Sequence, residues 1–121
     1  MKYVVLIFQN PGAFEAMSEA ERERLFAEAD VFLKEFSDSG ELLLGNALAD
    51  AATAKTVRVS EGGVPAVTDG PYAEAKEYLA GFYTLDCESI ERACEIAAKD
   101  PAARLWGVEV RPVMDEAGPD V

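Results

Sequence analysis

Strand-like and helix-like runs of hydrophobic residues follow one another along this chain. Residues 2–8 are apolar at nearly every position, so the first strand is expected to be central and covered on both faces. Further strands are predicted where apolar residues alternate or cluster between turn formers. They span residues 41–48, 55–60, 64–68, 79–86 and 105–113.

Two helices are predicted between these strands. The first begins at a capping box formed by Ser18 and Glu21 and ends near Gly40. The second runs from about Glu88 to Lys99, and Pro101 follows its end. Apolar residues at the 3.6-residue period predict their buried stripes: Leu25, Phe26, Ala29, Phe32, Leu33 and Phe36 in the first, and Ile90, Ala93, Cys94, Ala97 and Ala98 in the second.

The order of these elements is βαβ, then a β-hairpin, then βαβ again. The hairpin turns at residues 61–63, and Pro65 places its second arm at an edge because proline cannot donate to a ladder. Two split βαβ units predict a ferredoxin-like α+β fold, with an antiparallel sheet and two helices on one face. The first strand is apolar on both faces, so the open face is expected to pack against a second copy in a symmetric homodimer.

Length and charge narrow the class of protein. With 121 residues, one domain is expected over residues 1–113, followed by a disordered tail at 114–121. The net charge of −12 repels polyphosphate and excludes direct nucleic-acid binding. No apolar run approaches the roughly 20 residues of a membrane span, and no signal-peptide pattern is present. A cytoplasmic protein that does not bind membranes is therefore expected.

The residue types available for chemistry are restricted. The chain has no histidine, and its two cysteines, Cys87 and Cys94, are far short of a zinc set. No calcium-loop pattern is present either, so neither a metal ion nor a cofactor is expected. Cys94 is predicted to be an inert core residue, whereas Cys87 lies near a helix start that could lower its thiol pKa. General acid–base catalysis would therefore have to use Asp, Glu, Tyr, Lys or Cys side chains.

The chemically densest stretch runs from Thr68 to Lys76. Asp69-Gly70-Pro71 is typical of a tight turn, in which the aspartate caps backbone N–H groups and glycine allows a positive φ. The same rigidity would also pre-organise Asp69 as a general base or a ligand-binding carboxylate. Both interpretations remain open, and Asp69 is the candidate catalytic residue.

Further candidate ligand-binding residues surround that turn or share its strands. Glu74 and Lys76 form either a solvated surface pair or a polar clamp in which Lys76 holds an anionic group. Tyr72 either anchors the loop or supplies a phenolic donor, and Tyr83 shares a strand face with Gly81. Arg111 and Glu109 lie two residues apart on one face, which predicts a partly buried ion pair at a dimer interface, with a ligand-binding arginine as the alternative.

Taken together, several segments resemble the YCII-related, or DGPF-domain, family. They are Thr53–Arg58, Thr68–Glu74, Lys76-Glu77, Gly81-Phe82-Tyr83 and the ending Glu109–Val113. The resemblance spans nearly the whole chain and implies a ferredoxin-like dimeric α+β barrel. Similar domains occur beside or fused to extracytoplasmic-function sigma factors, which implies a sigma-factor association.

This chain departs from the family pattern at three points. Tyr72 replaces the phenylalanine of the DGPF motif, and Ala75 stands where similar sequences often have threonine. The YCII branch is thought to use a His–Asp pair, and that pair is not possible here because histidine is absent. Two functions are consistent with these observations. One is a dimeric small-molecule-binding domain, or an accessory or regulatory domain, with its ligand at residues 69–72. The other is an isomerase- or lyase-like enzyme with Asp69 as its base.

Overall fold

A computed structural model describes residues 1–72 and 76–114 of the chain. The elements follow the order β1 (Lys2–Gln9), α1 (Glu19–Asp38), β2 (Leu42–Ala47), a 3₁₀ turn (Ala51–Thr53), β3 (Lys55–Val59), β4 (Pro65–Asp69), β5 (Tyr78–Asp86), α2 (Ile90–Ala97), α3 (Pro101–Leu105) and β6 (Val108–Pro112). None of the described helices is long and apolar enough to cross a bilayer.

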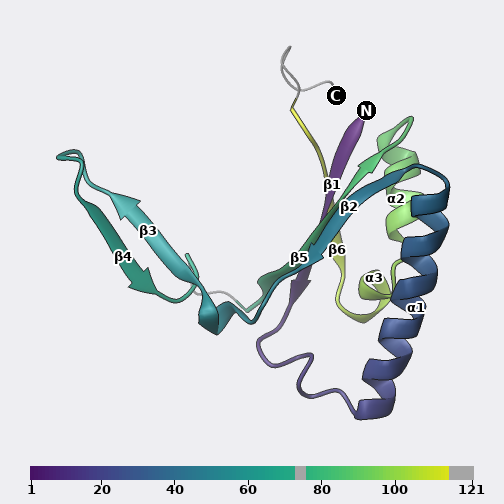
Figure 1. Ribbon diagram of the computed structural model, residues 1–121, viewed down its shortest axis with the longest axis horizontal. Helices are drawn as coiled ribbons and strands as arrows, with labels where there is room; N and C mark the ends of the chain where they lie inside the picture. The colour runs from purple at the N-terminus through teal and green to yellow at the C-terminus, as the bar shows by residue number, and fades with distance from the viewer. Residues whose placement is uncertain (73–75, 115–121) are drawn as a thin grey trace.

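The main sheet is antiparallel, with strand order β2-β5-β1-β6. Strand β1 pairs with both β5 and β6, so the predicted central position of the first strand is confirmed. Helices α1, α2 and α3 all lie against the same face of the sheet (Figure 1). This arrangement confirms the predicted ferredoxin-like α+β class, with a third helix added.

The core lies between that sheet face and the helices. Alternate residues of β1 and β5 point into it, and Val5 and Leu85 are completely buried. Phe32 and Phe36 of α1 and Ile96 of α2 pack against them. The capping box of α1 is confirmed, because Ser18 and Glu21 exchange side-chain-to-backbone hydrogen bonds of 2.9 and 3.1 Å.

The predicted inner stripe of the second helix is wrong at Ile90, Cys94 and Ala98, which are exposed. The buried residues of α2 are Ala93, Ile96 and Ala97. The pattern was ambiguous because this eight-residue helix carries small apolar residues on several sides. The expectation for Cys87 is also corrected: the residue is buried, and burial raises the pKa of its thiol, which disfavours a nucleophilic thiolate.

The last strand is shorter than predicted because a separate helix precedes it. The Asp100 side chain accepts a 2.9 Å hydrogen bond from the backbone N–H of Ala102, and Pro101 occupies the first turn of α3. Trp106 caps the end of α3 and does not lie on the face of β6. Asp100-Pro101 marks the start of α3. The sequence pattern alone had indicated only that the second helix ends before Pro101.

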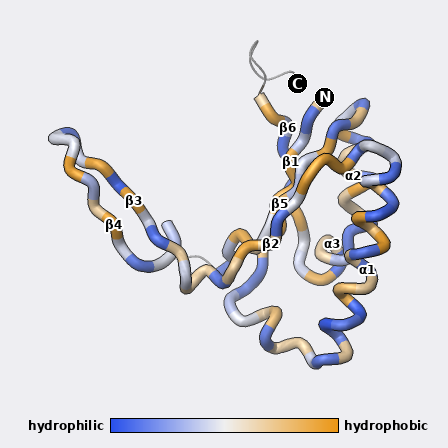
Figure 2. The backbone as a smooth tube through the Cα atoms, viewed as in Figure 1, coloured by the Kyte–Doolittle hydropathy of each residue, from blue (hydrophilic) through white to orange (hydrophobic). Residues whose placement is uncertain are grey.

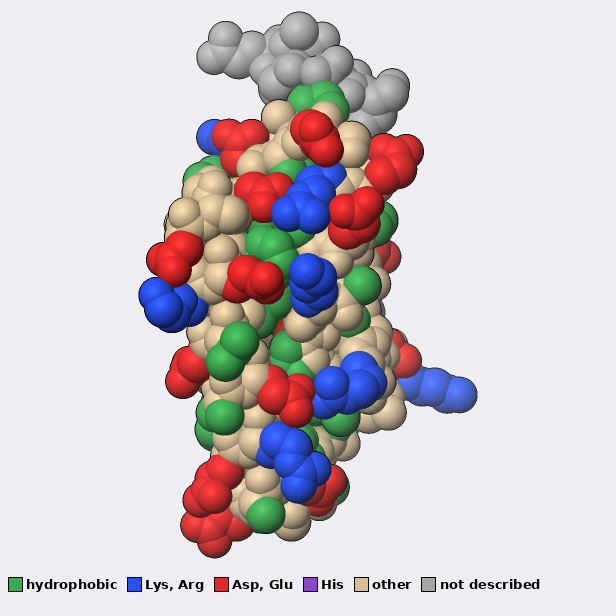
Figure 3. All heavy atoms as spheres, turned by 90° about the vertical axis from the view of Figure 1, so that its right-hand side faces the viewer, with side chains coloured by type: hydrophobic (Ala, Val, Ile, Leu, Met, Phe, Trp, Pro, Cys, Tyr) green, Lys and Arg blue, Asp and Glu red, His purple; other side chains and the backbone are tan. Residues whose placement is uncertain are grey.

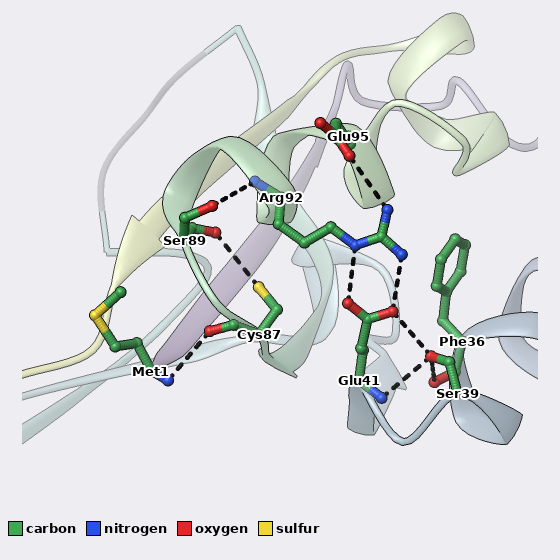
Figure 4. Close-up of polar contacts among 8 residues, drawn as sticks. All are labelled: Met1, Phe36, Ser39, Glu41, Cys87, Ser89, Arg92 and Glu95. Carbon is green, nitrogen blue, oxygen red and sulfur yellow. Dashed lines mark hydrogen bonds and ion pairs between the residues drawn. The ribbon is translucent and has the colours of Figure 1, made fainter.

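A charged cluster joins α2 to the turn between α1 and β2 (Figure 4). The Arg92 guanidinium donates two 2.9 Å hydrogen bonds to the Glu41 carboxylate and a 3.2 Å bond to Glu95. The Ser39 hydroxyl donates to Glu41 at 3.0 Å. Over the rest of the helix side, acidic and basic side chains are interspersed across the surface (Figure 3).

The predicted hairpin is present, but it does not join the main sheet. Strands β3 and β4 form their own two-stranded sheet. We call residues 55–69 the arm, because they project from the sheet on the side away from the helices (Figure 1). The edge position expected for Pro65 is confirmed.

Candidate functional site

A cavity of about 800 Å³ opens on the helix side of the main sheet. Its walls come from the C-terminal ends of β1 and β2 and the segments that follow them, the first half of β5, residues 25–33 of α1, and α3. A volume of this size falls within the roughly 300–1,000 Å³ of ordinary ligand pockets. The apolar residues that line it include Ile7, Phe14, Leu25, Phe26, Phe32, Leu33, Leu79, Pro101 and Trp106.

Much of this wall is the stripe predicted for the first helix. Phe32 is buried, but Phe26 and Leu33 are 55% and 41% exposed. The stripe therefore fills the core only at Phe32 and Phe36. From residue 25 to residue 33 the same apolar pattern faces the cavity, where Phe14 packs beside Phe26 with ring centroids 5.8 Å apart.

Two buried polar side chains, Tyr83 and Asp100, form part of the cavity wall. They are only 4% and 7% exposed. The Tyr83 ring is fixed by an edge contact with Phe32, with centroids 5.5 Å apart, and by close packing against Gly45. Within the described part of the chain, the buried Tyr83 hydroxyl has no hydrogen-bond partner of acceptable geometry.

The two groups nevertheless affect each other electrostatically. Burial raises the pKa of Tyr83 far above its usual range, and the nearby Asp100 charge adds to that shift. Burial also raises the pKa of Asp100, although the Ala102 N–H and the Tyr83 hydroxyl partly oppose the change. Tyr83 therefore stays a neutral phenol, and Asp100 holds a proton more readily than an exposed aspartate does.

The charge of the cavity wall restricts what it can hold. Among the described residues that line it there is no lysine or arginine, but there are three carboxylates, Glu15, Asp50 and Asp100. An anionic ligand would meet repulsion without a compensating cation. The wall suits a neutral or positively charged molecule of mainly apolar character.

Most of the residues predicted from the dense stretch lie outside this cavity. Asp69 is at the end of β4, with its side chain 86% exposed and ion-paired to Lys55. Tyr72 is 73% exposed, and the Arg58 guanidinium stacks over its ring at 4.8 Å. Lys76 is exposed, and Glu74 lies outside the described residues. The turn reaches the cavity through Pro71, after Gly70 with its φ of +100°.

The predicted pair Glu109 and Arg111 lies on the opposite side of the sheet. Val108 and Val110 pack towards the core, so the alternating residues Glu109 and Arg111 share the uncovered face. Their nearest charged atoms are 4.0 Å apart, and the side chains are 53% and 68% exposed. The shared face is confirmed, but in a single chain the pair is not partly buried as expected.

The structure thus brings one predicted ligand-binding residue, Tyr83, into the cavity, and it adds Asp100, which pattern reasoning missed. These two residues come from β5 and the start of α3, 17 positions apart in the sequence. The only local sign of Asp100 was its place before Pro101, and nothing in the pattern paired it with Tyr83.

The comparison with known domains decides the family. The YCII-related domain matches residues 1–117. The chain belongs to the YCII-related family. It is also 35% identical over 115 residues to an uncharacterized protein of Rhizobium meliloti (strain 1021), covering 93% of this chain and 92% of that protein.

A solved structure supports the fold of this YCII-related protein. The chain is similar to 5-chloro-2-hydroxyhydroquinone dehydrochlorinase (TftG) from Burkholderia phenoliruptrix AC1100, with a TM-score of 0.53 and 14% identity. The similarity covers 98% of this chain and 99% of the dehydrochlorinase. At this level of identity the likeness concerns the fold alone.

Proposed function

We propose that this YCII-related protein is a small-molecule-binding domain whose ligand occupies the cavity between α1 and the main sheet. The ligand is neutral or cationic, mainly apolar, and carries a hydroxyl or carbonyl group that pairs with Tyr83. The observation that carries the proposal is the buried Tyr83 hydroxyl, which lies near Asp100 but makes no hydrogen bond of acceptable geometry to a described residue, in the wall of an apolar cavity.

The energetic argument starts from the cost of that hydroxyl. A buried polar group without a hydrogen bond costs about 1–3 kcal/mol. A ligand atom that donates to or accepts from Tyr83 removes this cost and places its apolar part against Phe26, Phe32 and Leu33. The same interaction orients the ligand, because the Tyr83 ring is itself fixed by Phe32.

The solved relative suggests which small molecules to try first. Its structure is a complex with 2,5-dihydroxybenzoquinone, a single ring that carries oxygen substituents. A phenol or a related ring compound has the chemistry described above, with an apolar body and one hydroxyl. We therefore propose single-ring phenols as the starting ligand class for this cavity.

General acid–base catalysis is the alternative function, and the cavity favours Asp100 over Asp69 for it. Asp100 is a buried carboxyl with a raised pKa beside a phenol, the kind of pair that transfers protons in enclosed sites. Asp69 is exposed on the arm and paired with Lys55, so its role as a base stays a prediction.

We also propose that the protein is a homodimer and forms the dimeric α+β barrel that its family resemblance implies. The support is the face of the main sheet opposite the helices. It carries partly exposed apolar residues, including Val4, Leu6 and Phe82, and the described residues leave it uncovered. Covering it with a second copy would remove that apolar area from water.

The ligand proposal is tested by binding of three matched phenols, para-ethylphenol, tyramine and para-hydroxyphenylacetate, measured by thermal shift and calorimetry. We expect the neutral and cationic compounds to bind and the carboxylate to bind at least tenfold more weakly. Tyr83→Phe keeps the ring and removes the hydroxyl, so it should weaken binding by about tenfold, equivalent to about 1.4 kcal/mol.

The control for this experiment is Asp69→Asn, which alters the exposed carboxylate outside the cavity and should leave binding unchanged. Tyr83→Phe should itself fold with undiminished stability, because it removes a buried group that has no partner. Equal binding of the carboxylate, or unchanged affinity in Tyr83→Phe, would contradict the proposed site. Loss of binding in Asp69→Asn would indicate that the ligand binds at the turn of residues 69–72 instead of in the cavity.

A further inference from the structure

We propose that the arm packs through one of its two faces onto a second copy of this chain. This inference rests on the proposed homodimer and goes beyond it, because it assigns a specific contact to a segment outside the main sheet. The contact face consists of Val57, Val59, Pro65 and Val67, which we call the valine face.

The pairing of β3 with β4 separates the arm into two unlike faces. Val57 lies opposite Val67, and Val59 lies opposite Pro65, so all four side chains share one face. The other face carries Thr56 opposite Thr68 and Arg58 opposite Ala66. Arg58 is already engaged there by the ring of Tyr72. Figure 2 shows hydrophobic positions along both strands of the arm.

The valine face is open to solvent in a single chain. Val57, Val59 and Val67 are 59%, 62% and 62% exposed, and Val64 beside the turn is 66% exposed. A hairpin of two strands is at best marginally stable by itself in water, and packing of its apolar face is what usually stabilises it. The described residues of the same chain do not cover this face, which leaves it free to pack against another molecule.

The two strands of the arm are joined firmly at its base. The Thr56 hydroxyl donates to the Gly70 carbonyl at 2.8 Å, and the Gly70 N–H donates to the Ala54 carbonyl at 2.8 Å. Lys55 and Asp69 form an ion pair across the same end of the hairpin. All three contacts close the base of the hairpin, so its two strands leave the domain together in the direction that Figure 1 shows.

That direction identifies a second copy as the occupant. Figure 1 shows the arm on the side of the main sheet that the helices leave open. The uncovered sheet face on that side carries Val4, Leu6, Phe82 and the 52% exposed Leu44. A copy seated on this face lies beside the arm, and by two-fold symmetry its own arm lies beside the first chain.

The distribution of charge supports the same partner. The arm contains Lys55, Arg58, Glu61 and Asp69, whose charges cancel, so the net charge of −12 belongs to the rest of the chain. Two copies repel each other through their acidic surfaces and can approach through neutral ones. The valine face is neutral, and Glu109 and Arg111 on the uncovered sheet face also cancel.

The test uses Val67→Asp and Thr68→Asp, neighbouring residues of β4 on opposite faces of the arm. Both variants add one negative charge to the same strand. Molar mass is measured by light scattering across a dilution series, with the thermal unfolding of each variant recorded beside it. We expect a wild-type dimer, a dimer dissociation constant raised at least tenfold by Val67→Asp, and little change with Thr68→Asp.

The possible outcomes distinguish the proposed arm contact from the proposed homodimer. A wild-type dimer that Val67→Asp leaves intact overturns the arm contact and leaves the homodimer standing. If both variants weaken the dimer equally, the arm contact is also overturned, because the effect would not depend on which face of the arm carries the added charge. A monomeric wild type contradicts the homodimer and the arm contact together. Phenol binding, measured on the same samples, reports on the cavity independently of all three results.

Discussion

At the scale of single residues, the site depends on the buried side chain of Tyr83, which is held by tight packing. Tyr83 contacts Phe32 on one side and faces Gly45 of β2 on the other. A Cβ atom added at Gly45 would lie 2.9 Å from the Tyr83 Cβ and 3.2 Å from the Phe82 carbonyl oxygen. Glycine at this position is therefore required by the close approach of β2 to β5.

Gly45→Ala should destabilise the protein by about 1–3 kcal/mol, the usual cost of overpacking. The added methyl group would meet the Tyr83 Cβ and the Phe82 backbone carbonyl, which cannot rotate away as the end of a flexible side chain could. Chemical denaturation measures the change. Gly62→Ala is the matched control, since the nearest atom to its added methyl group is the Ser60 hydroxyl at 3.8 Å. Equal stability of the two variants would show that β2 can shift away from Tyr83 at little cost.

Asp100 has two opposing effects on stability, and pH separates them. Its carboxylate caps α3, but burial raises its pKa above the usual value of 3.8. The folded state therefore binds more protons than the unfolded state as pH rises from about 3.8, and stability falls across that window until Asp100 ionises in the folded protein.

Asp100→Asn should keep the cap and remove this penalty, because asparagine is an equally good N-cap. The melting temperature of the variant relative to wild type is expected to be higher at pH 7 than at pH 3.5. Asp100→Ala, which also loses the cap at a cost of about 1 kcal/mol, should be less stable than Asp100→Asn at both pH values. A pH-independent difference between Asp100→Asn and wild type would contradict the raised pKa.

At the scale of elements, the Arg92–Glu41 contact fixes α2 against the start of β2. Hydrogen bonds from Arg92 hold the pKa of Glu41 below its usual value of 4.5. A lowered pKa means that the unfolded state binds more protons in this window. The stability that Glu41 contributes is therefore fully present above pH 4.5 and is lost as pH falls through the lower, folded value.

Glu41→Gln should thus be less stable than wild type at neutral pH, and the difference should shrink below pH 4.5. Urea denaturation at a series of pH values measures it. Glu95→Gln is the control, because the Glu95 side chain is 66% exposed and makes one 3.2 Å bond to the same arginine. A Glu41→Gln penalty that persists undiminished in acid would rule out the charged contact as its cause.

Elements also differ in how well the pattern predicted them. Helix α1 and the strands β1 and β5 were located within about two residues, because each has a long run of periodic apolar residues and distinct residues at its start and end. Helix α3 was missed because five residues cannot display a helical period. The inner side of α2 was placed wrongly at Cys94 because alanine and cysteine occupy several of its sides.

At the scale of the whole molecule, two apolar surfaces remain open in one chain. One is the sheet face opposite the helices, and the other is the valine face of the arm. Both lie on the same side of the domain, whereas the cavity opens on the helix side. Assembly and ligand binding therefore use different faces of the domain, which approach each other at the root of the arm, where residues 50–52 and Pro71 border the cavity.

The sequence by itself determined the fold class and the order of the elements other than α3, because local periodicity and capping residues carry that information. It also determined the family, through the motifs that resemble the YCII-related pattern. It also selected Tyr83, through its place on a strand face beside Gly81. Only the tertiary structure decided that Asp100 lies beside Tyr83, that residues 25–33 of α1 border a cavity, and that Asp69 lies on an arm outside it. These relations join segments far apart in sequence, and local patterns do not encode their separation in space.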